Sequence, residues 1–358
     1  MEPLTFLILL LAPYAFFGLV IFIMAHRLRN HKEYSYNPTV TIFLPTFNEV
    51  NYIAGKLDNL LSQTYPIKEI LIFDCSTDGT DQIVEQYKKK FPSITLIRQP
   101  ERIGNARTFN EALKLASGEL FVRTDSDSIS EPNALKEIVS NFADKNVGAA
   151  TGILPADKGV EKLFRQVMTT IQIAESNIDS TLIAHAASFL TFRTSLLEPV
   201  KENSFAEDTE EFLLIRKKGY KTIVDPTSIS REEVPADYAV RRKQKSRRAQ
   251  GIVEVLLDNF HMLLNPKYGK YGALVLPIEW FILIFSPVLL ILFVAILTYA
   301  AYLVHPLFSV AIITIIGIAV IHRSNILYTI MDTQLSGLIG LAKSLGRRNS
   351  DTLWEKVR

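Results

Sequence analysis

The stretch that decides the fold is Glu119-Leu120-Phe121-Val122-Arg123-Thr124-Asp125-Ser126-Asp127. Residues 120–123 predict a short buried strand, which delivers two carboxylates spaced one residue apart. Hard divalent cations take oxygen ligands of this kind and often bridge the phosphates of a substrate. The same three residues also suit a plain surface turn, because Asp and Ser bond to their own backbone. The order of the surrounding motifs favours the metal site.

Strand and helix patterns alternate along this part of the chain. Strands are predicted over residues 40–44, 69–73, 94–98 and 120–123, and helices over residues 53–62, 81–91 and 107–116. Pro45 is expected to close the first strand. This alternation indicates an α/β fold with a mostly parallel sheet. Ligands of such sheets bind beyond the carboxyl ends of the strands.

Polar residues gather at three of those strand ends, in residues 45–49, 74–79 and 125–127. We expect the first end, which contains Pro45, Thr46 and Glu49, to meet a base and a ribose. Asp74 at the second end suits a hydrogen bond from a base or a hydroxyl. The third end would hold a metal ion on a diphosphate.

A loop rich in cations follows. Arg102 and Arg107 flank Gly104 just before a predicted helix, whose N-terminus favours phosphate. The chain has no GxGxxG and no GxxxxGK[ST] pattern, so neither a dinucleotide fold nor a P-loop is predicted. Asp78 and Asp81 are interpreted as turn and helix-capping residues.

Two later segments carry charge that a site can use. Glu207 and Asp208 belong to an acidic run ahead of a helix predicted over residues 212–215. The helix dipole favours acids there, but one of these two carboxylates suits a general base if it faces the sheet edge. The basic run 241–248 leads into an amphipathic stretch, residues 252–264. It suits either an anchor on anionic lipids or a contact to the donor.

Composition separates the middle of the chain from its ends. Hydrophobic residues make up 48% of the 358 residues, and the excess lies in the first two dozen residues and from about residue 273 onward. The middle, residues 38–265, is long enough for one well-cored domain. A net charge of +2 implies no strongly acidic or basic partner, and no nucleic acid is expected. The single cysteine, Cys75, excludes an intramolecular disulfide and a cysteine-based zinc site.

Three apolar stretches, residues 3–24, 282–304 and 307–321, are predicted to span a membrane. The basic flank 26–32 follows the first span, which indicates an uncleaved anchor with its charges in the cytoplasm. The same rule places the C-terminus inside, with residues 326–345 as an amphipathic helix on the inner surface. Buried helices of a soluble protein are the alternative.

Taken in order, these elements resemble the membrane-embedded family 2 glycosyltransferases, which include the cellulose, chitin and hyaluronan synthases. The motifs that carry the resemblance match in order and approximate spacing over nearly the whole chain: residues 45–49, Asp74 with 78–79, and residues 102–110, 125–127, 206–208, 244–248 and 354–356. The resemblance implies a GT-A fold and an inverting transfer from a nucleotide-diphospho-sugar, a UDP- or GDP-sugar.

The resemblance also implies roles for single residues. Glu49 and Asp74 would touch the nucleoside, and Asp127, helped by Asp125, would hold Mg²⁺ or Mn²⁺ on the diphosphate. Asp208 matches the general base that acts on the acceptor hydroxyl. The residues that match a Gln-x-x-Arg-Trp element covering the donor are Gln244, Arg247 and Arg248.

Two positions depart from the family pattern. Arg248 stands where the family has a Trp, which in the polymerising members stacks on the acceptor sugar, so long-chain processive synthesis is less expected. Ala206 replaces the usual Thr before Glu207 and Asp208. His185 lies roughly where the family places an acceptor-side loop and is a candidate acceptor contact.

The sequence therefore predicts a multi-pass protein of the cell membrane with a cytoplasmic catalytic domain. It would transfer sugar to a lipid-linked or glycan acceptor among membrane lipids, with polysaccharide synthesis as one outcome. A polyprenyl (dolichyl)-phosphate sugar synthase and a non-enzymatic membrane sensor of sugar nucleotides are the alternatives. The predicted parts are a membrane helix at 1–30, a GT-A domain at 38–235, an interfacial region at 236–270, membrane helices at 273–325 and an interfacial tail at 326–358.

Overall fold

The computed structural model describes residues 3–26, 32–156, 159–202, 204, 206–232, 238–321 and 326–346. The chain divides into two compact units. We call Leu28–Pro155 with Glu175–Ala236 and Ser350–Arg358 the sheet unit, and Met1–Arg27 with Ala156–Ala174 and Asp237–Asn349 the helical unit. Predicted features at 27–31, 205, 322–323 and 347–358, including residues 354–356, lie outside the described residues.

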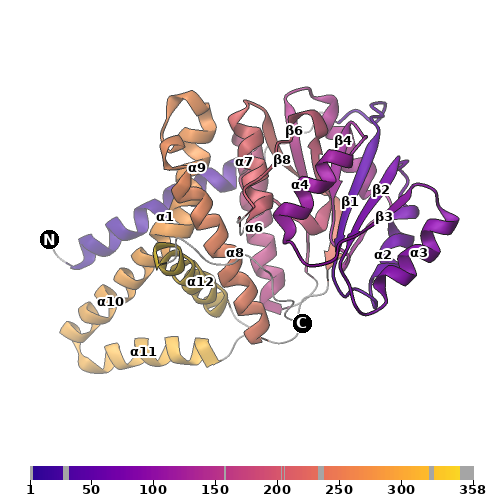
Figure 1. Cartoon of the computed structure of the whole chain (residues 1–358). Helices are drawn as coiled ribbons and strands as arrows, with labels where there is room; N and C mark the ends of the chain where they lie inside the picture. The colour runs from indigo at the N-terminus through magenta and orange to yellow at the C-terminus, as the bar shows by residue number, and fades with distance from the viewer. Residues whose placement is uncertain are drawn as a thin grey trace. The chain divides into compact units, whose positions relative to one another are not determined.

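The sheet unit is built on a sheet that has eight strands within the described residues, in the order β3-β2-β1-β4-β7-β6-β8-β5 (Figure 1). Strands β3, β2, β1 and β4 pair in parallel, whereas β7 runs antiparallel to β4 and β6. The predicted α/β fold is confirmed. The strand bounds are β1 (Val40–Thr46), β2 (Glu69–Asp74), β3 (Ile94–Arg98), β4 (Leu120–Arg123), β5 (Ser128–Ser130), β6 (Val147–Ile153), β7 (Leu190–Arg193) and β8 (Lys221–Glu232).

Strand β1 is longer than predicted, because it continues through Pro45 to Thr46. The pairing of β1 with β4 ends at Phe43, whereas its pairing with β2 continues to Thr46. Pro45 therefore lies where the strand has a partner on one side only, a position at which proline is tolerated. The expectation that Pro45 ends the strand was wrong.

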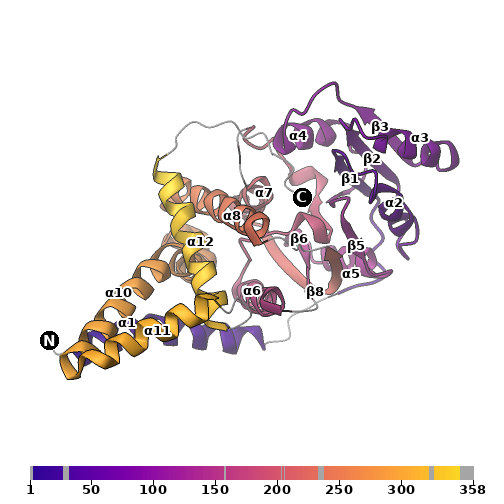
Figure 2. The ribbon, with the colours of Figure 1, turned by 90° about the horizontal axis from the view of Figure 1, so that it is seen from below.

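Helices cover both faces of the sheet (Figures 1 and 2). On one face, Leu120 and Val122 pack in a core with α2 (Ile53–Leu61), α3 (Thr80–Lys90) and α5 (Ala134–Ser140). On the other face, Phe121 packs with α4 (Asn105–Leu115) and α7 (Glu207–Lys217). Successive side chains of a strand alternate between faces, so Arg123 continues on the α7 face and Thr124 on the α2 face.

The helical unit holds long helices that pack on one another. Helix α12 packs along α8 (Figure 2), and Gly340 permits the close approach because a Cβ there would lie 2.8 Å from the Gln250 nitrogen. Lys245 of α8 pairs with Asp332 of α12 at 3.1 Å. The helix bounds are α1 (Pro3–Ala25), α6 (Gly159–Ile178, shared with the sheet unit), α8 (Tyr238–Asp258), α9 (Leu276–Trp280), α10 (Ser286–Val304), α11 (Pro306–Ile321) and α12 (Ile326–Gly346).

Apolar side chains dominate the surfaces of α1, α10 and α11. Among the described residues, the segments Ile8–Ala25 and Tyr271–Val304 are long and apolar enough to cross a bilayer, and α11 adds a shorter apolar run. Residues 271–304 are helical throughout, with α and π turns in succession. The predicted division into an entry segment and a span therefore falls within one helical run.

Candidate active site

Three strand ends meet at one edge of the sheet unit. Strands β2, β1 and β4 are parallel neighbours, so the residues that follow them lie side by side. The Thr46 hydroxyl donates to the Asp74 carboxylate at 2.6 Å, and the Ser76 hydroxyl donates to the same oxygen at 2.5 Å. Thr46 and Asp74 are both buried. The structure thus groups Thr46 and Asp74 beside the Asp125-Ser126-Asp127 turn that follows β4.

Hydrogen bonds link the loop after β1 to the loop after β2. Asn48, in the left-handed region with φ 55°, accepts from the Thr77 backbone N–H at 2.9 Å. The Glu49 backbone N–H donates to the Thr80 hydroxyl at 2.9 Å. Asp78 accepts from the Thr80 backbone N–H at 3.1 Å, the turn role that was expected for it. These bonds hold both loops in place before any ligand binds.

Arg102 lies over the first of these loops. Its guanidinium is 4.2 Å from the centre of the Phe47 ring, a cation–π contact. Gly104 has φ +90°, which favours glycine, and α4 begins at the next residue, two residues before the predicted start. Burial and the charge of Asp74 raise the pKa of the Cys75 thiol, and Arg102 opposes them. Arg102 and Cys75 therefore belong to the end of the site where the nucleoside was expected.

The turn after β4 concentrates negative charge. The pKa of Asp125 is raised to about 7: burial raises it most, the charge of Arg123 opposes this, the carboxylates of Asp127 and Glu232 raise it, and the charge of Lys56 lowers it. Glu232 comes from β8, where it pairs with Ser128. Neighbouring carboxylates repel one another when all are ionised, and a bound cation offsets that repulsion.

These residues fit a divalent ion that is shared with a substrate. Mg²⁺ is usually held by one or two carboxylates together with substrate phosphates and water. Among the described residues no group of three or more His, Cys, Asp or Glu side chains is arranged to hold a metal alone. Asp125 and Asp127 therefore suit a metal that binds together with a diphosphate.

Helix α7 brings its acidic N-terminus to the same edge. Arg123, the last residue of β4, donates to Glu207 at 2.8 Å, and both side chains are largely buried. Asp208 accepts from the Thr209 backbone N–H at 2.8 Å and is partly exposed. Glu207 is therefore held by Arg123, and the role of Asp208 as a general base stays a prediction.

Glu211 lies one turn further along α7 and is almost fully buried, with 2% of its surface exposed. Neither carboxylate oxygen has a hydrogen-bond partner among the described residues. Burial raises its pKa well above the usual range, Arg123 opposes this, and the carboxylates of Glu207 and Asp208 add to it.

Four charged residues of this edge were not predicted as site residues: Lys56, Arg123, Glu211 and Glu232. None of them belongs to a recognisable motif. Lys56 carried one signal, since it interrupts the apolar face of a predicted helix between Ile53 and Leu57. Arg123 and Glu232 are recognised only once the strands are paired.

The remaining predicted site residues lie on two other elements. Gln244, Arg247 and Arg248 share one face of α8 because they are three and four residues apart, and α8 belongs to the helical unit. Their contact with the donor stays a prediction. The His185 backbone N–H donates to the Thr151 hydroxyl at the carboxyl end of β6, at 3.1 Å. Its contact with an acceptor also stays a prediction.

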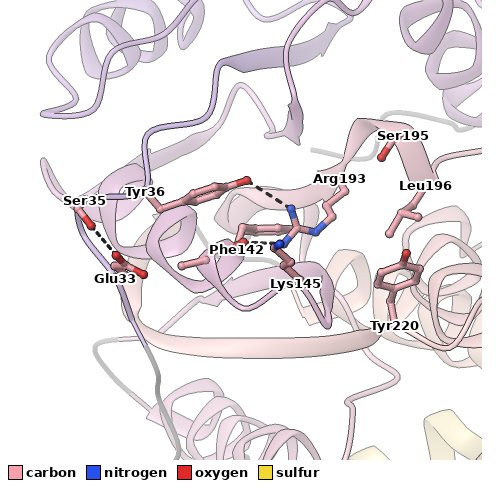
Figure 3. Close-up of a pocket in the computed structure, with 10 residues that line it drawn as sticks. Glu33, Ser35, Tyr36, Phe142, Lys145, Arg193, Ser195, Leu196 and Tyr220 are labelled. Carbon is pink, nitrogen blue, oxygen red and sulfur yellow. Dashed lines mark hydrogen bonds between the residues drawn. The ribbon is translucent and has the colours of Figure 1, made fainter.

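A cavity of about 540 Å³ lies at the opposite edge of the sheet unit, where the parallel strands begin (Figure 3). Arg193 lines it, but its guanidinium donates to the carbonyls of Val147, Phe142 and Asp144 at 2.8, 2.5 and 3.0 Å. The Tyr36 hydroxyl accepts a fourth bond at 3.4 Å. Arg193 therefore secures this edge of the fold and has little capacity left to bind a ligand.

A mixed α/β sheet with paired carboxylates at the end of β4 fits a glycosyltransferase domain of the GT-A type. The model of the family described as Glycosyl transferase family 2 matches residues 41–222, about half of the chain. The chain belongs to this family.

Relatives of known function agree with this membership. The chain is 27% identical over 241 residues to a poly-beta-1,6-N-acetyl-D-glucosamine synthase of Staphylococcus aureus (strain MSSA476), an alignment that covers 64% of this chain and 58% of the relative. It is 31% identical over 179 residues to a poly(ribitol-phosphate) beta-glucosyltransferase of Bacillus spizizenii, which covers 48% of this chain and 27% of the relative. The alignments thus span only part of these relatives' length.

A solved structure is similar over almost the whole chain. It is the mannosyltransferase PcManGT from Pyrobaculum calidifontis in complex with GDP-Man and Mn²⁺. The two chains superpose with a TM-score of 0.82 at 25% identity, covering 97% of this chain and 100% of the other. This likeness supports the GT-A fold and extends beyond the residues that the family model matches.

Proposed function

We propose that this glycosyltransferase is metal-dependent and inverting, and that it transfers a sugar from a nucleotide-diphospho-sugar to an acceptor hydroxyl at the cytoplasmic face of a membrane. One observation carries the proposal. The carboxylates that suit a metal–diphosphate complex and the acidic N-terminus of α7 lie at one sheet edge, joined by the ion pair of Arg123 and Glu207 at 2.8 Å.

In this proposal each group has a separate task. Asp127 and Asp125 would hold Mg²⁺ or Mn²⁺, which would supply positive charge to balance the leaving diphosphate. Asp208 takes the proton of the acceptor hydroxyl as its oxygen bonds to the sugar carbon and the bond from that carbon to the diphosphate breaks. The donor is bound by Pro45, Thr46, Glu49, Asp74 and Arg102 and covered by Gln244, Arg247 and Arg248.

GDP-mannose with Mn²⁺ is the first donor to test. The similar mannosyltransferase structure contains both, and the nucleoside end of this chain offers a carboxylate and a guanidinium at Asp74 and Arg102. UDP-sugars are the comparison, because a UDP- or GDP-sugar fits the family equally.

The single cysteine of the chain gives a direct measurement of donor binding. Cys75 is half-buried beside Asp74 and Arg102, so a bound nucleoside diphosphate is expected to slow its alkylation by N-ethylmaleimide. The experiment uses the full chain in detergent with GDP or UDP, each with and without Mn²⁺. Cys75→Ala controls for labelling elsewhere. Equal alkylation rates with and without every nucleotide would contradict the proposed donor site.

The base assignment is tested by two adjacent substitutions. Asp208→Asn is expected to lower kcat by about 100- to 10,000-fold, the usual effect of removing a general base. Glu207→Gln removes a charge from the neighbouring position without removing the base and should cost much less. If Asp208→Asn retains transfer to a polyprenyl phosphate, the alternative of a polyprenyl-phosphate sugar synthase is favoured, because that acceptor is already ionised.

A non-enzymatic sensor is the second alternative. Donor hydrolysis or transfer that requires Mn²⁺ and disappears in Asp127→Ala would exclude it. Binding of a nucleoside diphosphate without any turnover of its sugar ester would favour it.

The membrane placement is also part of the proposal. The exposed apolar surfaces of α1, α10 and α11 support three spans, since exposed apolar patches of that extent are unusual in a monomeric soluble protein. With Arg248 in place of the stacking Trp, transfer of one or a few sugars is proposed rather than long-chain synthesis. Proteolysis in inside-out vesicles tests the topology, because the sheet unit should then be accessible from outside.

A further inference from the structure

Polar side chains on α2 and just after it follow the chain away from the Asp125-Ser126-Asp127 turn. Lys56 and Asn59 are three residues apart and share one face of α2, and Gln63 lies two residues beyond the last residue of the helix, Leu61. Asn59 exchanges two hydrogen bonds with the backbone of Ser130, at 2.8 and 2.9 Å. Gln63 donates to the Glu131 carbonyl and accepts from the Leu135 backbone N–H, both at 3.1 Å.

Lys56 holds the part of this segment that carries the carboxylates. Its Nζ donates to the Thr124 hydroxyl at 2.7 Å, to the Ser128 carbonyl at 2.9 Å and to the Ser128 hydroxyl at 3.0 Å. An ammonium group has three N–H donors, and all three are used. Thr124 and Ser128 are the residues immediately before and after the Asp125-Ser126-Asp127 turn. The Lys56 side chain thus links the two ends of the turn on the α2 face of the sheet.

Stability alone does not explain a lysine at this position. Lys56 is fully buried, and its neighbours on α2 are Ile53, Leu57 and Leu60. Burial lowers the pKa of Lys56 to about 7, although the charges of Asp125 and Asp127 oppose the change. An apolar side chain would avoid this desolvation, and departures from the local pattern of this kind are concentrated at functional sites.

We propose that Lys56 is the positioning residue of the metal site: by tying Thr124 to Ser128 it sets the separation and direction of the Asp125 and Asp127 carboxylates. The inference rests on the proposed metal-dependent function. Lys56 does not touch the metal or the substrate itself. It acts on the ligands through their neighbours, as residues around metal ligands do in other proteins.

The direction of the change in metal affinity separates this role from a purely electrostatic one. Removing a positive charge beside two carboxylates would, by itself, tighten the binding of a divalent cation. Losing the tie between Thr124 and Ser128 would weaken it, because the two carboxylates are no longer held for one ion. The proposal therefore requires weaker binding when Lys56 is replaced.

The test measures Mn²⁺ binding to the full chain in detergent, from the electron paramagnetic resonance signal of free Mn²⁺. Lys56→Met and Lys56→Gln are expected to raise the Kd for Mn²⁺ by about 10- to 100-fold. Gln63→Leu is the matched control, since it removes a polar tie just beyond the end of α2 without touching the turn, and its Kd should equal that of the wild type. An unchanged or lower Kd in the Lys56 variants would overturn the proposal.

Thr124→Val keeps the test decisive if the Lys56 variants do not fold. It preserves the shape of a buried side chain and removes the oxygen that accepts the shortest Lys56 bond. A rise of about 3- to 10-fold in the Kd for Mn²⁺ is expected, and no rise overturns the proposal.

The wild type and Asp127→Ala identify which claim has failed. If both bind Mn²⁺ equally, the proposed metal site is wrong. If Asp127→Ala alone loses the ion while the Lys56 and Thr124 variants bind normally, only the role of Lys56 is wrong.

Discussion

Two buried cations flank the carboxylate turn on opposite faces of the sheet, and their partners differ. Lys56, on the α2 face, donates to the hydroxyl and carbonyl oxygens of Thr124 and Ser128, and its pKa falls to about 7. Arg123, on the α7 face, pairs with Glu207, and the carboxylates around it raise its pKa despite burial. Burial is similar at the two sites, so the charge of the partners decides whether the buried cation is favoured.

The comparison of Lys56 with Arg123 separates the geometry of the site from the stability of the fold. Lys56 donates its hydrogen bonds to neutral oxygens, which an apolar side chain would leave without a donor, and the charges of Asp125 and Asp127 act on it as well. Arg123 balances the charge of the carboxylates around it, and Glu207 is its direct partner. We therefore expect Lys56 to matter most for the shape of the site and Arg123 to matter most for folding.

The largest effect is expected from Arg123→Met. This change leaves Glu207 with an uncompensated charge in a largely buried position, and breaking a buried pair in this way costs about 3–5 kcal/mol. The free energy of unfolding of the full chain in detergent, from urea titration, measures it. Pairing the change with Glu207→Gln should recover part of the loss. A loss below about 1 kcal/mol, the range expected for an exposed pair, would contradict the comparison.

Lys56→Met is expected to have a smaller effect on stability than Arg123→Met. It leaves the oxygens of Thr124 and Ser128 without their donor, at about 1–3 kcal/mol, but also removes a desolvated ammonium group. The same urea titration measures it. A destabilisation as large as that of Arg123→Met would show that neutral and charged partners do not differ as proposed.

Glu211→Gln is expected to change how stability depends on pH. Because the pKa of Glu211 is raised in the folded protein, the native state binds a proton that the unfolded chain releases above about pH 4.5. The contribution of protonated Glu211 to the free energy of unfolding is fully present below that pH. It is lost as the pH rises toward the pKa of Glu211 in the folded protein. The stability of Glu211→Gln relative to the wild type should therefore rise with pH, by up to about 1.4 kcal/mol per unit. Unfolding titrations between pH 5 and pH 8 measure the slope, and a flat difference would contradict the prediction.

The smallest effect is expected from an exposed arginine. Arg98 pairs with Asp81 at 3.2 Å and with Glu85 at 3.1 Å, and about half of its side chain is exposed. Solvent screens these pairs, so Arg98→Ala should change the free energy of unfolding by no more than about 0.5 kcal/mol. A larger loss would mean that burial is not what distinguishes Arg123. The measurement is the same titration at low and at high salt.

Local patterns in the sequence were sufficient to predict the elements near the site. Strands β3 and β4 have the predicted bounds, and α2, α3 and α4 differ from prediction by one or two residues at their ends. The alternation of strands and helices was enough to group Thr46, Asp74 and Asp125 at one edge, because parallel strands place their carboxyl ends together. Pro45 misled the prediction, since nothing local shows on which side β1 is paired.

The sequence by itself determined the α/β order, the carboxylate turn and the family. Those features depend on periodicity and on short motifs, which are read within a few residues. Only the tertiary structure decided that Lys56 lies behind the turn, that Arg123 holds Glu207 and that Glu211 is buried with no hydrogen-bond partner among the described residues. These relations join residues that are 68, 72 and 84 positions apart, and strand pairing and helix packing bring them together. A charged residue on a predicted helix or strand has no defined partner until that packing is known, so its role follows from the fold.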